Sequence, residues 1–218
     1  MVTLCIDGDN EDYTDIVSTY RARGLKIKIL RCEENHGAGV ARQYIIDNSI
    51  CDYITFIDAD DIVNPRFVEV LYTEAKLGNY DIVSASFIRE NSKGADVLMS
   101  SDSNVITWMH GKIYKRQFLV EKNLRFREDL RLNEDAYFNM VAMHATNNKA
   151  TIDEPLYIWR DYKNSVTRRS VRRDYFEKSY YDYIHGQVEA LKRIYEINGD
   201  IYDGLVSNAL KNIYYHYM

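Results

Sequence analysis

Strand-like and helix-like segments alternate along the first 90 residues of this chain, and this alternation limits the folds open to it. Short apolar runs typical of strands occupy residues 2–6, 25–30, 53–57 and 80–87. Segments with the apolar spacing of helices lie between them, at residues 12–23, 40–48 and 65–76. Strands joined by helices usually form parallel pairs with helices on the faces of the sheet. We therefore predict an α/β protein with a Rossmann-like, mostly parallel sheet flanked by helices.

Polar loops follow three of these strands. An acidic turn with a glycine, Asp7-Gly8-Asp9, ends the first strand, and a glycine loop at residues 35–39 follows the second. A second acidic turn, residues 58–61, follows the third strand directly. Ligands of such folds bind beyond the carboxyl ends of the strands. The sequence therefore predicts a ligand site at this edge of the sheet.

Three carboxylates crowd the second acidic turn, at Asp58, Asp60 and Asp61. Aspartate is also favoured in turns and at helix starts, but Asn64 already supplies a cap for the next helix. Like charges placed so closely repel one another, and a bound cation relieves the repulsion. Because these ligands are hard oxygens with no cysteine or histidine beside them in sequence, they favour Mg²⁺ or Mn²⁺, which often bring phosphate oxygens with them.

Five further stretches carry motif-like residues in a fixed order. They are Glu34–Gln43, Phe56–Asp61, Gly111–Arg116, Phe126–Asp135, and Pro155–Arg160 continued by Ser165–Thr167. In that order they resemble the N-x-G-x-x-x-A-R-N, DxD, G-K-L-Y-R-R, F…E-D and L-Y-x-Y-R…S-V-T stretches of family 2 glycosyltransferases. The resemblance covers about residues 2 to 168. It implies the GT-A fold and inverting transfer of a sugar from a nucleotide-sugar donor, a UDP-sugar, to an acceptor hydroxyl.

The resemblance also implies how the DxD carboxylates are used. They would hold Mn²⁺ or Mg²⁺ against the donor diphosphate, where the ion neutralises the departing nucleoside diphosphate. Asp60 is then the expected direct metal ligand. Asp58 would face the ribose or the metal shell, and Asp61 would support the site.

Two further positions match nucleotide-binding residues of the family. The first acidic turn resembles the family's D-D-G-S loop, so Asp7 or Asp9 would contact the nucleobase or ribose. Its order is Asp-Gly-Asp rather than Asp-Asp-Gly, which leaves the choice between them open. Arg42 matches an arginine that approaches the nucleotide; the alternative is a solvated helix residue.

Asp135 matches the catalytic aspartate of the family's E-D pair. It would act as the general base that takes the proton from the acceptor hydroxyl, and Glu134 would tune or position it. Both residues also suit the first turn of a helix over residues 136–144, where the macrodipole favours acids. Trp108 and His110 are candidates for the acceptor cleft, although such residues more often pack in a core.

The match departs from the family at its start. Family members open with a V-S-V-I-I-P-x-Y-N strand and a helix, whereas this chain matches from the second strand onward, so we expect that first unit to be missing. An open sheet edge would then need cover from a second copy or a partner chain. The alternative function is a catalytically degenerate GT-A-like domain that acts as a binding or assembly module.

The tail of the chain has helical spacing, so we divide the chain into a GT-A-like domain, residues 1–172, and a C-terminal helical extension, residues 173–218. Residues 160–173 hold six basic residues and one acidic residue. This basic segment has three interpretations: a solvated connector between domains, a loop that closes over the donor diphosphate, or a contact with an anionic membrane. The last reading uses Arg168, Arg169, Arg172 and Arg173.

Composition excludes several other classes. The net charge of −5 disfavours a nucleic-acid partner, and no run of about 18 apolar residues suggests a membrane span. Three scattered cysteines do not form a disulfide framework. The first residues are too short for a signal peptide, so we expect a cytoplasmic location. The expected acceptor is a glycan, a lipid-linked molecule or a protein, with surface polysaccharide synthesis as one setting.

Overall fold

The computed structural model describes residues 1–91, 94–99, 108–161 and 173–217, which form eight strands and seven helices. The strands are β1 (Val2–Asp7), β2 (Ile27–Cys32), β3 (Tyr53–Thr55), β4 (Ile62–Val63), β5 (Ile82–Arg89), β6 (Val97–Met99), β7 (Lys112–Lys115) and β8 (Lys149–Trp159). The helices are α1 (Thr14–Ala22), α2 (Ala38–Asp47), α3 (Phe67–Leu77), α4 (Arg116–Glu121), α5 (Glu134–His144), α6 (Arg173–Asn198) and α7 (Asp203–Tyr217).

The strands form two sheets. β1 and β2 make a two-stranded parallel sheet, and the other six strands follow the order β3-β7-β5-β8-β4, with β6 paired to β5. The predicted α/β class with helices against a sheet is confirmed, and so is the alternation of strands and helices up to β5.

The predicted mostly parallel pairing is corrected by the observed ladders. β1 with β2 and β5 with β8 are parallel, whereas β3 with β7, β5 with β7, β5 with β6 and β4 with β8 are antiparallel. The reason is that β7, from a part of the chain without clear periodicity, lies between β3 and β5. These two strands still run in the same direction, because each is antiparallel to β7.

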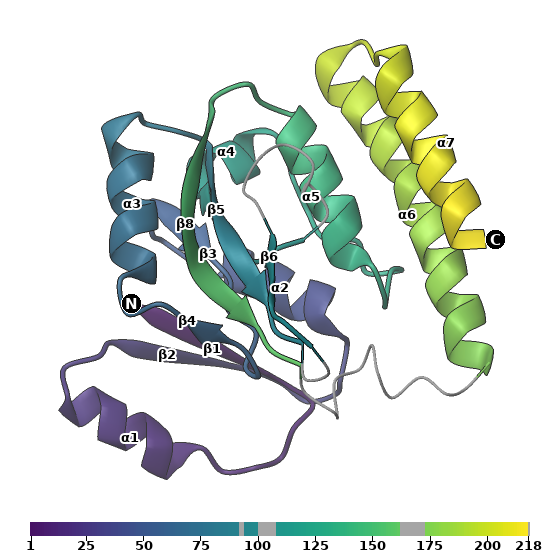
Figure 1. The fold of residues 1–218 in the computed structure, drawn as a ribbon. Coiled ribbons are helices and arrows are strands. Elements are labelled where there is room, and N and C mark those ends of the chain that lie inside the picture. The colour runs from purple at the N-terminus through teal and green to yellow at the C-terminus, as the bar shows by residue number, and fades with distance from the viewer. Residues whose placement is uncertain (92–93, 100–107, 162–172, 218) are drawn as a thin grey trace.

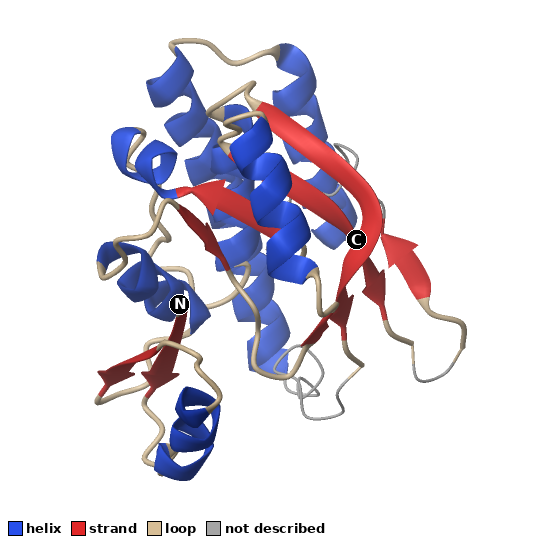
Figure 2. Ribbon diagram, turned by 90° about the vertical axis from the view of Figure 1, so that its left-hand side faces the viewer, coloured by secondary structure: helices blue, strands red, loops and turns tan. Residues whose placement is uncertain are grey.

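The two-stranded sheet is set apart from the larger one (Figure 2). Among the described strands, β1 pairs only with β2, and β3 pairs only with β7, so each has one free edge. Helix α2 connects the two parts, because it packs against both β1 and α5. Cover of a free edge by a second copy or a partner chain stays a prediction.

Hydrophobic side chains pack on both faces of the six-stranded sheet. Successive residues of a strand point to opposite faces, so Ile82 joins one core and Val83 the other. The Val83 core lies under α3, and the Ile82 core lies under α5 (Figure 1). Helices α6 and α7 add Ile194 and Leu205 to this second core. The helical extension therefore packs on the rest of the chain, and its boundary at residue 173 stays a prediction.

Truncation of a core aromatic residue tests this packing. Phe138 of α5 is 1% exposed and stacks on Phe126, with ring centroids 4.0 Å apart. Phe138→Ala is expected to lower the free energy of unfolding by about 3–5 kcal/mol, because it leaves a cavity. Urea denaturation measures this. Val120→Ala, at a residue 55% exposed on α4, should change stability by less than about 0.5 kcal/mol; equal effects of the two substitutions would contradict the packing.

Candidate active site

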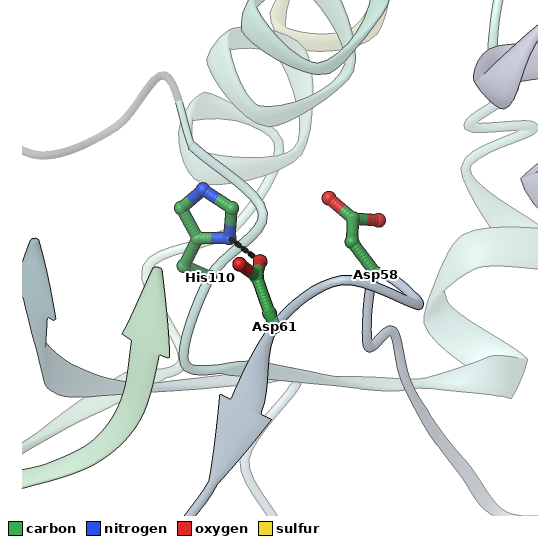
Figure 3. Close-up of side chains that lie close together, drawn as sticks. All are labelled: Asp58, Asp61 and His110. Atoms are coloured by element: carbon green, nitrogen blue, oxygen red, sulfur yellow. Dashed lines mark ion pairs between the residues drawn. The ribbon is translucent and has the colours of Figure 1, made fainter. Parts of the chain in front are cut away.

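The acidic turn between β3 and β4 lies beside a histidine from the segment before β7. Ligand atoms of Asp58, Asp61 and His110 all lie within 4.8 Å of one another, and Asp61 Oδ2 is 3.9 Å from His110 Nδ1 (Figure 3). Burial lowers the pKa of His110 to about 4, so the imidazole is neutral at pH 7. Sequence reasoning placed His110 only in the acceptor cleft, because no local pattern joins it to the turn at residues 58–61.

Asp61 is already held by the protein. Its Oδ2 accepts a hydrogen bond from the Tyr157 hydroxyl at 2.6 Å, and its Oδ1 accepts one from the Arg160 backbone N–H at 2.9 Å. Burial raises the pKa of Asp61, and these two donors act against that rise. Asp61 therefore fastens the end of β8 to the acidic turn. Its predicted role in a metal site stays a prediction.

Asp60 differs from its neighbours. Its side chain is exposed and has no hydrogen bond to any other residue in the described part of the chain. Asp58 has one oxygen, Oδ1, engaged by Arg42 at 2.7 Å. Among the described residues of this turn, Asp60 is thus the carboxylate with both oxygens free to bind a cation. A set of carboxylate oxygens suits a hard ion such as Mg²⁺ or Mn²⁺.

A second acidic pair lies at the start of α5. Glu134 is buried, and its Oε1 accepts a hydrogen bond from Arg42 Nη1 at 2.7 Å. Asp135 is partly buried, and its Oδ1 accepts the Ala136 N–H at 2.8 Å. Burial, and then the neighbouring Glu134 charge, raise the pKa of Asp135 to about 7, although Arg42 opposes the rise. A carboxyl group with this pKa can accept a proton near neutral pH.

A glycine in α2, Gly39, lets the side chain of Glu134 pack closely against this helix. A Cβ atom at Gly39 would lie 2.9 Å from Cγ of Glu134, which is closer than real contacts allow. Glycine therefore permits the contact of α2 with the start of α5. This gives a physical reason for the glycine in the loop that sequence analysis singled out.

Arg42 is not a solvated helix residue. Its side chain is 11% exposed, and its two terminal nitrogens bind Asp58 and Glu134. Although burial acts in the opposite direction, these two carboxylates raise the pKa of Arg42, which stays charged. Its proximity to a nucleotide stays a prediction.

The first acidic turn lies against the N-terminus of α2. The Asp7 carboxylate accepts hydrogen bonds from the backbone N–H groups of His36 and Gly37, at 2.9 and 2.7 Å. Asp9 is partly exposed and accepts hydrogen bonds from the Glu11 N–H and the Tyr13 hydroxyl. Asp7 thus fixes the glycine loop. Which of the two aspartates contacts a nucleotide stays a prediction.

Two other expectations concern membranes. Arg168, Arg169 and Arg172 lie outside the described residues, as does the side chain of Arg173, so the predicted membrane contact stays a prediction. In the described part of the chain, no helix combines the length and the apolar character needed to cross a bilayer. The cytoplasmic location also stays a prediction.

The fold is that of GT-A glycosyltransferases. A crystal structure of TarS from Staphylococcus aureus matches with a TM-score of 0.71 at 21% identity, over 97% of this chain and 37% of that one. TarS 1–349 in complex with UDP-GlcNAc matches with a TM-score of 0.68 at 20% identity, over 97% and 71% of the two chains. The mannosyltransferase PcManGT from Pyrobaculum calidifontis, in complex with GDP-Man and Mn²⁺, has a TM-score of 0.56 at 14% identity, over 88% and 55%.

Sequence comparison shows the family. Residues 2–153 match the model of glycosyl transferase family 2, and the chain belongs to this family. Glycosyltransferase EpsJ of Bacillus subtilis is 28% identical over 186 residues, which are 76% of this chain and 54% of EpsJ. The poly(ribitol-phosphate) beta-N-acetylglucosaminyltransferase TarS of S. aureus is 25% identical over 170 residues, 72% of this chain and 29% of TarS. The chain spans about half the length, or less, of these relatives.

Proposed function

We propose that this chain transfers a sugar from a nucleotide-sugar donor, a UDP-sugar, to an acceptor hydroxyl with inversion at the anomeric carbon. One observation carries the proposal. Arg42 joins Asp58, in the acidic turn that also contains the free carboxylate Asp60, to Glu134. The residue next to Glu134 is Asp135, whose carboxyl group has a pKa near neutrality. The family and the ligand bound in one TarS structure, UDP-GlcNAc, support the same assignment.

The acidic turn is the proposed donor side. Asp60 and Asp58 would hold Mn²⁺ or Mg²⁺, which when bound neutralises charge on the departing nucleoside diphosphate. Asp61 keeps the turn in place through Tyr157 and the Arg160 backbone. The donor complex of PcManGT with GDP-Man and Mn²⁺ is a precedent on the same fold.

Asp135 is the proposed general base. As the acceptor oxygen forms its bond to the anomeric carbon, its proton passes to the Asp135 carboxylate, and the bond from that carbon to the diphosphate oxygen breaks. Attack on the face opposite the leaving group inverts the configuration. The hydrogen bond from Arg42 holds the Glu134 carboxylate in place, and the charge of that carboxylate helps to raise the pKa of Asp135.

The acceptor is proposed to be a glycan, a lipid-linked molecule or a protein, in surface polysaccharide synthesis. The names of relatives support this class, since TarS is named for transfer to poly(ribitol-phosphate).

A donor panel tests the proposed function. The protein is incubated with Mn²⁺ or Mg²⁺, a set of UDP- and GDP-sugars and simple acceptors, and release of nucleoside diphosphate is measured. Release that depends on one donor class and stops on chelation of the metal is expected. Absence of release and of calorimetric nucleotide binding with every donor would favour the alternative, a binding or assembly module.

The rate should depend on pH through Asp135. Only its carboxylate form accepts a proton, so kcat is expected to fall about tenfold per pH unit below the pKa of about 7 and to level off above it. Initial rates at saturating donor measure this, with UDP binding followed over the same range as the control. A rate that stays constant from about pH 5 to pH 9 would count against Asp135 as the base.

A further inference from the structure

Arg42 connects the two acidic groups of the site. It lies on α2, while Asp58 follows β3 and Glu134 begins α5, so one side chain joins three elements. Both contacts are 2.7 Å, which is within the range of charge-assisted hydrogen bonds. The partners lie 16 and 92 residues away in sequence.

The surroundings fix the position of this guanidinium. The Asp7 carboxylate holds the start of α2 through two backbone N–H groups, and the Arg42 guanidinium lies 6.0 Å from the centre of the Phe126 ring. The side-chain oxygen of the next residue, Gln43, accepts the Phe126 N–H at 2.9 Å. Helix α2 is therefore fastened both to β1 and to the segment that leads into α5.

The charges around Arg42 require a cation at this place. Asp58, Glu134 and Asp135 each contribute to raising the pKa of Arg42 against the effect of its burial. Without the guanidinium, Asp58 and Glu134 would lose a shared partner and repel each other. A lysine would keep one positive charge, but its ammonium lacks the planar fork that reaches two carboxylates at once.

We propose that Arg42 is a positioning residue that sets the Asp58 carboxylate of the donor side relative to the Glu134–Asp135 pair of the acceptor side. This inference rests on the proposed function. Both terminal nitrogens of Arg42 bind carboxylates, which leaves the nucleotide-contacting role implied by resemblance without those two donors. Its loss should therefore affect the chemical step more than donor binding.

The test compares two arginine-to-lysine variants. Arg42→Lys is expected to lower kcat by about 10- to 100-fold, because displacement of reacting groups by about 1 Å has that cost. The donor KM and the Kd for UDP with Mn²⁺ should rise by less than kcat falls, because Asp60, which has no bond to Arg42, would still hold the ion. Arg125→Lys is the matched control, since Arg125 also forks onto a carboxylate, that of Asp47, but on the exposed surface. Its kcat should not change.

A second variant protects the test against misfolding of the first. Glu134→Gln keeps the shape of the side chain and removes its charge, and it should lower kcat while leaving UDP affinity unchanged. If both substitutions break one unit, the double variant should lose less than the product of the two single losses. Unchanged kcat in Arg42→Lys, or a tenfold weaker UDP affinity with unchanged kcat, would overturn the positioning role. Absence of transfer by the unaltered protein would instead contradict the proposed function.

Discussion

Asp135→Asn is expected to lower kcat by about 10²–10⁴-fold, because the amide cannot take the proton of the acceptor hydroxyl. The substitution keeps the size of the side chain, and an amide oxygen can still accept the Ala136 N–H that the carboxylate accepts now. Binding of the donor, which we propose to occur at the acidic turn on the other side of Arg42, should change little. Nucleoside diphosphate release under saturating donor measures kcat, and calorimetry with UDP measures binding.

The same variant has a distinctive effect on stability. Burial raises the pKa of Asp135, so the folded protein favours the protonated carboxyl group. The stability that this protonated group contributes is lost as the pH rises through about 7. Asparagine carries no charge, so Asp135→Asn should be at least as stable as the original protein at pH 8. Loss of turnover with intact stability separates a catalytic effect from misfolding. Asp153→Asn, at an exposed position on β8, is the control and should retain full activity. Full turnover in Asp135→Asn would contradict the assignment of the base.

Local patterns predicted the first half of the fold well because its elements are periodic. The residues of β1, α1, β2, α2, β3, α3 and β5 were all expected as strands or helices near their observed bounds. The position of β7 was not predictable in the same way. It is a four-residue strand, and its first three residues are all buried although they point alternately to the two faces of the sheet. Buried and exposed positions therefore do not alternate along it. Its antiparallel insertion between β3 and β5 depends on tertiary packing.

The candidate site shows the same division between local and distant information. The chemistry of the acidic turn follows from Asp58, Asp60 and Asp61 as a local cluster. The difference between these three aspartates cannot be read from the local cluster, because Asp61 is bound by Tyr157 and Arg160, which lie 96 and 99 residues further along the chain. Helical periodicity could place Arg42 on α2, but not the two carboxylates that surround it.

Asp60→Asn is expected to reduce metal-dependent transfer by about 100-fold or more, since a divalent ion would stabilise the leaving diphosphate by several kcal/mol and Asp60 is its proposed ligand. The side chain is exposed and without a partner in the described structure, so the free energy of unfolding should not change. Calorimetric titration with Mn²⁺ in the presence of UDP should show weaker uptake of the ion.

Asp61→Asn is the best comparison, because it should lower stability more, and Mn²⁺ uptake less, than Asp60→Asn does. Asp61 holds Tyr157 and the Arg160 N–H, so its replacement should lower the free energy of unfolding by about 1–3 kcal/mol. Uptake of Mn²⁺ should be reduced less than in Asp60→Asn, because the role proposed for Asp61 is to keep the turn in place. If Asp60→Asn left both Mn²⁺ uptake and transfer unchanged while Asp61→Asn abolished them without loss of stability, the ligand would be Asp61, and the metal site would be the cluster that it forms with Asp58 and His110.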